Sequence, residues 1–301
     1  MRSWVVALLL TAFASALLFE ACTSDLSPPH NPGGESHVDP RAGGNSAESS
    51  PGEGAPIDRT AAARNFHVAL GLPKDADDSD DALLDETAFL VSYSARLRGP
   101  NWVAWRLEAT DLGHVRRHDA FHADALLPAG MYRVTPHDYK RPYDRGHLCP
   151  FGDRSATQES ARRTFVMTNM EPQLHELNAG PWEKLEEYER ARATRPDSVL
   201  YLVAGGVYGD APSRIGHGVA VPRATFKIVV ALERGQGAKD VTIATHTVAV
   251  EMPNEAGVGR RPWQDFVTSI DHIEADTGYD FLTAVPEAVQ AVVEAREPRE
   301  L

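Results

Sequence analysis

The chain has 301 residues, of which 42% are hydrophobic and 24% charged, a composition that excludes fibrous and fully disordered proteins. Its formal charge of −13 excludes a protein that coats nucleic acid through a generally basic surface, so any binding of a polyanion requires a local basic cleft. Two cysteines, Cys22 and Cys149, exclude a disulfide framework and match no zinc-binding spacing.

Residues 1–22 have the features of an export signal. Arg2 precedes an apolar run over residues 4–19, which has the length of a signal-peptide core and is short for a membrane span. Cleavage at the small residues 14–16 would secrete the chain, whereas the segment ending at Cys22 resembles a bacterial lipoprotein box, although Glu20 departs from its usual residues. We expect lipidation of Cys22 and a membrane-anchored protein facing the periplasm or the exterior; simple secretion and an uncleaved anchor are the alternatives.

Residues 23–56 differ in composition from everything that follows. They are dense in Pro, Gly and Ser and contain almost no large apolar residue, so they cannot bury enough surface to offset the entropy of ordering. We predict a disordered linker over 23–56. Residues 57–301 have a globular pattern with no internal repeat and no second linker, which predicts a single domain.

The globular part combines predicted strands with predicted helices. Runs rich in β-branched and aromatic residues predict strands over 89–93, 102–107, 199–207, 226–232 and 241–252. Pro181 and Pro262 each precede a helical pattern, over 182–193 and 263–275, and Pro suits the first position of a helix. This mixture predicts an α+β fold in which helices flank a central sheet rich in antiparallel pairs.

The segment 143–150, YDRGHLCP, contains the first pattern that suggests chemistry. A neutral imidazole at His147 can accept a proton from water near neutral pH, and the neighbouring Arg145 can bind phosphate oxygens. Gly146 allows the backbone to approach a substrate closely. The string DRGH is short, and by itself it equally fits a turn with a surface ion pair and a packed histidine.

Two segments downstream make the pattern specific. Residues 169–173 read N-x-x-P-Q, and residues 178–186 contain N-x-G-x-W followed by Leu185-Glu186. Together with DRGH, in this order and spacing, the chain resembles the DNA/RNA non-specific endonucleases, the ββα-metal nucleases that include mitochondrial endonuclease G and secreted bacterial nucleases. The resemblance covers about residues 66–285 and implies the ββα-metal nuclease fold. Cys149 departs from it, because Ala is commoner there.

The resemblance assigns the central catalytic and metal-binding roles. His147 matches the general base that activates water for attack on phosphorus, and Asn178 matches the direct protein ligand of Mg²⁺, for which Mn²⁺ is an alternative. Glu186 would hold water on the metal. Arg190, four residues later on the same helix face, would face the phosphate or brace Glu186; an ordinary surface ion pair is the alternative.

Four more residues receive supporting roles from the same resemblance. Arg117 matches an arginine that stabilises the charged transition state, with the adjacent Arg116 almost equally suitable. Arg145 would contact phosphate or hold its loop through an acidic partner. Asp144 would orient its surroundings, and Asn169 would organise the site through hydrogen bonds without touching the metal.

Two other chemistries are open to these segments. The spacing of His114, His118 and His122 is that of zinc ligands on one helix face, although no glutamate base lies within the pattern. Cys149 adjoins His147, which suggests a thiol nucleophile, but hydrolysis of a phosphodiester needs none and cysteine often serves as a small buried apolar residue.

We therefore expect an exported, Mg²⁺-dependent endonuclease that hydrolyses DNA and RNA with little sequence preference. Contacts to phosphates would supply affinity without reading bases. The alternative is a non-catalytic exported lipoprotein that uses the same fold to bind nucleic acid or a partner protein. The preference between DNA and RNA, the biological role and the oligomeric state stay open.

Overall fold

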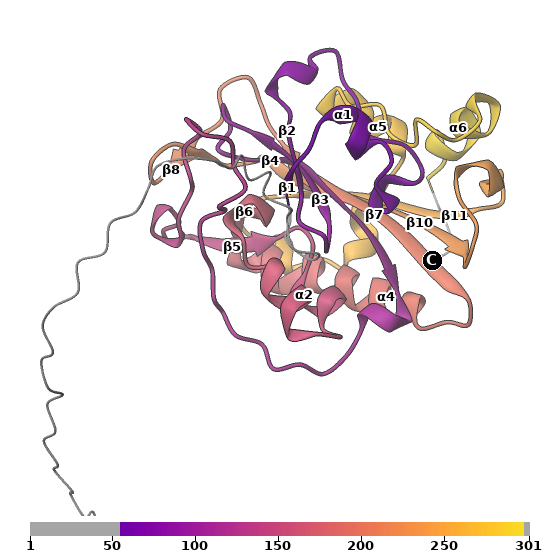
Figure 1. Ribbon diagram of the computed structural model, residues 1–301, viewed down its shortest axis with the longest axis horizontal. Helices are drawn as coiled ribbons and strands as arrows, with labels where there is room; N and C mark the ends of the chain where they lie inside the picture. Colours follow the sequence, from indigo (N-terminus) through magenta and orange to yellow (C-terminus); the bar gives the residue numbers. More distant parts are fainter. Residues whose placement is uncertain (1–54, 298–301) are drawn as a thin grey trace, which may run out of the picture. The chain divides into compact units, whose positions relative to one another are not determined.

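The computed structural model describes residues 55–297, and its central feature is an eight-stranded antiparallel sheet (Figure 1). The strand order across the sheet is β1-β2-β3-β4-β7-β10-β11-β12. The strands are β1 (Ala55–Pro56), β2 (Ala82–Asp85), β3 (Leu90–Ser94), β4 (Gly99–Glu108), β7 (Ser198–Val207), β10 (Ala224–Glu233), β11 (His246–Pro253) and β12 (Val267–Thr268).

The long central strands are apolar on both faces because both faces of the sheet are covered. Along β10, Val229 packs into one hydrophobic cluster, while Ile228 and Val230 pack into another on the opposite face. Along β4, Trp105 belongs to the first cluster and Trp102 to the second. Successive side chains of a strand point to opposite faces, so such strands read as nearly continuous apolar runs.

Helices cover the two faces of the sheet (Figure 1). The first cluster includes Leu185 of α4, and the second includes Ile273 of α5 and Val293 of α6. A small hairpin, β8 with β9, lies outside the main sheet. These elements span α1 (Arg59–Ala62), α4 (Glu183–Ala193), α5 (Ile270–Thr277), α6 (Glu287–Glu294), β8 (Arg214–Ile215) and β9 (Val219–Ala220).

A second two-stranded sheet and the helices around it form the part of the fold that carries the DRGH segment. Strand β5 (Tyr143–His147) pairs antiparallel with β6 (Met170–Leu174), and α2 (Gln158–Arg163) lies in the connection between them. The chain then continues through α3 (His175–Leu177) and a π-helical turn, η7 (Asn178–Trp182), into α4. Two strands followed by a helix constitute the ββα unit, so the predicted α+β fold is confirmed.

Most predicted strands coincide with observed ones. The predictions over 89–93, 102–107, 199–207 and 226–232 correspond to β3, β4, β7 and β10. The prediction over 241–252 began too early, because β11 starts at His246. Before it, the Thr242 backbone N–H donates to Thr245 Oγ1, and the Thr245 N–H donates to the Thr242 carbonyl, which closes a turn.

Of the two predicted helices, the one after Pro181 is observed as α4, and the one after Pro262 is wrong. Residues 263–266 form a short 3-10 turn, and β12 then pairs with β11 at the sheet edge. The helix α5 begins only after Ser269, whose side chain accepts a hydrogen bond from the His272 backbone N–H. Sheet pairing and this N-cap divide a pattern that looked like one amphipathic helix.

The predicted export segment, residues 1–22, lies outside the described residues, as does most of the predicted linker. The described part begins at β1, which pairs with β2 and occupies the last two residues of the predicted linker. Residues 55–297 belong to one compact unit. Within this range no helix has both the length and the apolar character needed to cross a membrane.

Candidate active site

The predicted catalytic and metal-binding residues converge on one cleft of about 290 Å³. They come from four separate parts of the chain: the 112–120 loop, β5, η7 and α4. The cleft is lined by Arg117, Arg145, His147, Pro150, Phe151, Gly152, Asn178, Ala179, Glu183, Glu186 and Arg190. Asp144 and Asn169, which were predicted to support the site, are not among the lining residues.

His147 ends β5 and is buried among aromatic rings. Its ring centroid lies 5.5 Å from that of Phe121 and 5.1 Å from that of Phe165, edge to face with the latter. Burial, together with the charges of Arg117 and Arg145, lowers the pKa of His147 to about 3. The imidazole is therefore neutral at neutral pH. Its Nε2 is buried without a hydrogen-bond partner, and the residue lines the cleft.

Asn178 is held at the start of η7 by Asp144. Asn178 Nδ2 donates to Asp144 Oδ2 at 3.1 Å, and the same oxygen pairs with His175 Nδ1 at 2.8 Å. Because the amide nitrogen is committed to Asp144, the carbonyl Oδ1 is the atom left to ligate a cation. Asp144 thus contacts both His175 and Asn178.

Glu186 and Arg190 lie one turn apart on α4 and contact each other. Arg190 Nη1 lies 3.6 Å from Glu186 Oε2 and 3.3 Å from Asp153 Oδ1. Arg190 thus contacts Glu186 and also lines the cleft, so both predicted roles for it stay predictions. Burial raises the pKa of Glu186 to about 7; Lys227 and Arg190 oppose the rise, and Asp153 adds to it.

The arginines at 116 and 117 are both exposed and differ in position. Arg117 lines the cleft, and its guanidinium carbon lies 5.4 Å from the Phe165 ring centroid, whereas Arg116 does not line the cleft. Arg145 lies 4.4 Å from the Phe121 ring centroid. Within residues 55–297 Arg145 makes no ion pair, so the predicted acidic partner is not observed.

Asn169 and Gly146 shape the backbone behind the cleft. Asn169 accepts a hydrogen bond from the Cys149 N–H at 2.9 Å and donates to the carbonyls of Cys149 and Thr164. A Cβ on Gly146 would lie 2.3 Å from Gln173 Oε1, so the glycine of DRGH permits β5 to pass the glutamine of the N-x-x-P-Q segment. The two motif segments therefore pack directly against each other.

The alternative zinc site is not formed. Residues 112–120 contain no helix, so a spacing of four residues does not align His114 and His118 with His122 on one face. The three do not appear among the groups of potential ligands that residues 55–297 bring within 4.8 Å of one another. The helical interpretation of this segment is therefore wrong, and the segment is a loop that leads into the cleft.

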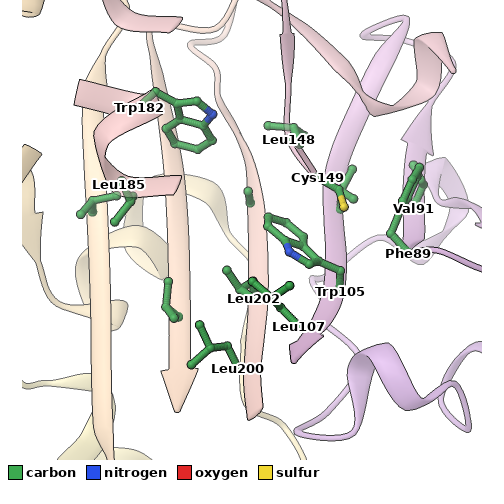
Figure 2. Packing of buried hydrophobic residues seen from close by; sticks show 14 of the residues in the cluster. Phe89, Val91, Trp105, Leu107, Leu148, Cys149, Trp182, Leu185, Leu200 and Leu202 are labelled. Carbon is green, nitrogen blue, oxygen red and sulfur yellow. The ribbon is translucent and has the colours of Figure 1, made fainter. Parts of the chain in front are cut away.

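Cys149 is a core residue. It is completely buried, does not line the cleft, and packs in the same cluster as Leu148 and Trp105, as Figure 2 shows. Burial raises the pKa of its thiol well above the usual range, which suppresses the thiolate that a nucleophile requires. The structure favours the apolar role for this cysteine.

Several residues of the site were missed in the sequence. Phe121 and Phe165 enclose His147, and Asp153 accepts hydrogen bonds from Trp105 Nε1 at 2.9 Å and from Arg190. Neither aromatic belongs to a motif, and Asp153 lies in a short 3-10 turn, η5 (Phe151–Arg154). Among the missed residues, only Lys227 could have been found from the sequence, because a lysine interrupts the apolar strand FKIVV there.

Known proteins resemble the chain over most of its length. Residues 72–288 match the family described as DNA/RNA non-specific endonuclease. A nuclease of Nostoc sp. is 37% identical over 247 residues, which cover 80% of this chain and 89% of the relative. Endonuclease G of Bos taurus is 29% identical over 214 residues, which cover 66% of this chain and 69% of the relative.

A solved structure supports the fold. A chain from the crystal structure of the EndoG/EndoGI complex superposes with a TM-score of 0.61 at 23% identity, covering 76% of this chain and 95% of that one. The matched region contains β5, β6 and α4 with all of the lining residues of the cleft. The extent of the family match and the identity to the Nostoc nuclease lead to one conclusion: the chain belongs to the DNA/RNA non-specific endonuclease family.

Proposed function

We propose that the cleft is the active site of a metal-dependent endonuclease that hydrolyses phosphodiester bonds of DNA and RNA. The observation that carries the proposal is the convergence of Arg117, Arg145, His147, Asn178, Glu186 and Arg190 on one cleft of about 290 Å³. A non-catalytic binding protein would have no need to keep a neutral imidazole, an amide and a carboxylate together there.

His147 acts as the general base. Its pKa of about 3 keeps the imidazole unprotonated at neutral pH, so it can accept a proton from an attacking water. Phe121 and Phe165 restrict the orientation of the ring, and Trp182 Nε1 donates to the His147 carbonyl at 3.2 Å, which anchors the end of β5. The base is therefore preorganised before substrate arrives.

The donor set of the cleft fits a hard divalent cation. Asn178 offers a neutral carbonyl oxygen, and Glu186 offers a carboxylate that can accept hydrogen bonds from water around the cation. Mg²⁺ keeps several waters and takes oxygen ligands, so we assign Mg²⁺ to Asn178, with Mn²⁺ as a functional substitute. When bound, the cation would neutralise charge on the phosphate and stabilise the leaving oxygen.

The arginines bind the phosphate group. Arg117 and Arg145 bring positive charge to the cleft, and each stacks on an aromatic ring that limits its motion. Guanidinium groups match phosphate oxygens and do not read bases, which explains cleavage with little sequence preference. This arrangement supplies the local basic cleft that an acidic chain needs. We propose products with 5′-phosphate and 3′-hydroxyl ends.

The test is degradation of plasmid DNA and of RNA by residues 55–301, with Mg²⁺ or with EDTA. We expect cleavage of both substrates with Mg²⁺, none with EDTA, and none by His147→Ala, which keeps its fold and its binding of nucleic acid. His118→Ala is the matched control, because His118 is an exposed histidine outside the cleft lining. Binding by the wild-type protein without cleavage would instead support the non-catalytic alternative.

We also propose that the chain is exported and anchored to a membrane through a lipidated Cys22. The support is Arg2, the apolar run over 4–19, and the polar segment 23–54 that would connect the anchor to the domain. Fractionation of cells that express the full chain or its Cys22→Ser variant tests this proposal. If both proteins are equally soluble in the exported fraction, the anchor is rejected and simple secretion is retained.

A further inference from the structure

Lys227 is a completely buried cation that none of the proposed steps uses. It lies on β10 beneath the cleft, and its Nζ is 3.2 Å from Glu189 Oε2. The same nitrogen lies 4.2 Å from the ring centroid of Trp182 and 5.4 Å from that of Trp105. Burial of an ammonium group is costly, so its retention at this position requires a reason.

The two tryptophans connect Lys227 to catalytic groups. Figure 2 shows Trp105 on β4 and Trp182 on the helical segment in the same buried layer. Trp182 donates its indole N–H to the carbonyl of His147 at 3.2 Å, and Trp105 donates to Asp153 Oδ2 at 2.9 Å. Asp153 is in turn the partner of Arg190, which braces Glu186.

The charges around Glu186 make Lys227 important for its ionisation. Lys227 from β10 and Arg190 from α4 face Glu186 as cations; Asp153 from η5 and Glu183 from α4 face it as anions. Glu189, which is completely buried, shares Lys227 with it and has a pKa that burial raises to about 8. Two completely buried carboxyl groups, Asp153 and Glu189, and the cleft-lining Glu186 therefore share two cations, Lys227 and Arg190.

We infer that Lys227 is a positioning residue of the active site, which supports the tryptophan layer beneath His147 and, together with Arg190, favours the anionic form of Glu186. The inference rests on the proposed function, since it concerns the carboxylate that serves the metal site. An anionic Glu186 accepts hydrogen bonds from water at both oxygens, whereas a protonated one offers fewer acceptors and a donor.

The experiment compares three variants at the buried pair. Lys227→Met removes the charge at similar length, Lys227→Arg restores it, and Glu189→Gln removes the anion that competes for Lys227. Lys239→Met is the matched control, because Lys239 is an exposed lysine in the short 3-10 turn η8 (Ala238–Asp240) that follows β10. Each variant is tested for the pH dependence of kcat/KM and, without metal or substrate, by ¹³C NMR titration of labelled Glu carboxyls assigned through Glu186→Gln.

We expect Lys227→Met to move the acid limb of activity and the Glu186 titration to higher pH by about one unit or more, because the cation that most lowers the pKa of Glu186 is lost. At pH values on the acid side of the limb, a shift of one pH unit corresponds to about a tenfold loss of kcat/KM. Lys227→Arg should return both readouts toward the wild-type values. Glu189→Gln should leave the limb in place or move it to lower pH, since an anion is lost.

A folded Lys227→Met variant with an unmoved limb and an unmoved Glu186 titration would overturn the inference. A shift of the acid limb to higher pH in Glu189→Gln would also overturn it. Loss of the Lys227 cation and loss of the Glu189 anion would then have the same effect, which disturbed packing explains and charge does not. If Lys227→Met does not fold, the direction in which Glu189→Gln moves the acid limb decides whether the inference holds. A wild-type protein without Mg²⁺-dependent cleavage would reject the proposed function instead, and the NMR titration would still test Lys227.

Discussion

The low pKa of His147 makes the stability of the protein depend on pH in a way that one substitution can isolate. In the unfolded chain the imidazole has its usual pKa of 6.5, and in the folded protein burial lowers this value to about 3. The unfolded state therefore binds more protons between these values, so this group destabilises the fold as the pH falls below 6.5. Between pH 7 and pH 5 we expect it to lower the free energy of unfolding by about 2 kcal/mol.

The assay is urea denaturation of the wild-type protein and of His147→Gln at pH 7 and at pH 5. Glutamine does not titrate, so the variant should lose about 2 kcal/mol less than the wild-type protein over this interval. His67, whose pKa burial lowers to about 3, is present in both proteins and cancels in the difference. Equal losses in the two proteins would refute the argument that the folded protein keeps His147 neutral, and with it the preorganised base.

Three further predictions concern the cleft and its surroundings. Asn178→Ala should lower the initial rate at limiting Mg²⁺ by about 10- to 100-fold, and an unchanged Mg²⁺ titration curve would place the ligand elsewhere. Arg117→Ala should lower kcat by about 100-fold or more while Arg116→Ala stays near wild type, and equal losses in steady-state kinetics would contradict the assignment. Cys149→Ala should cost about 1 kcal/mol in thermal unfolding and keep full activity, whereas inactivation would reopen a thiol mechanism.

Local sequence patterns were enough to predict the α+β fold and the motif residues. The strands β3, β4, β7 and β10 were predictable because both faces of the sheet are covered, which makes each strand a long apolar run. His147, Asn178 and Glu186 were predictable because DRGH and the downstream segments together resemble one family. Gly146 packs tightly against Gln173, so two of these segments lie directly against each other.

Only the tertiary structure decided where helices end and what surrounds each catalytic group. The pattern after Pro262 was helical in sequence, but pairing of β12 with the sheet edge divides it, and such pairing depends on β11, which lies outside that pattern. The environments of His147 and Glu186 depend equally on distant residues, because desolvation and charge act through space. Lys227, 80 residues after His147, lies beneath the cleft only because β10 pairs beside β7. Local motifs thus specify which groups react, whereas the packing of remote segments sets their ionisation.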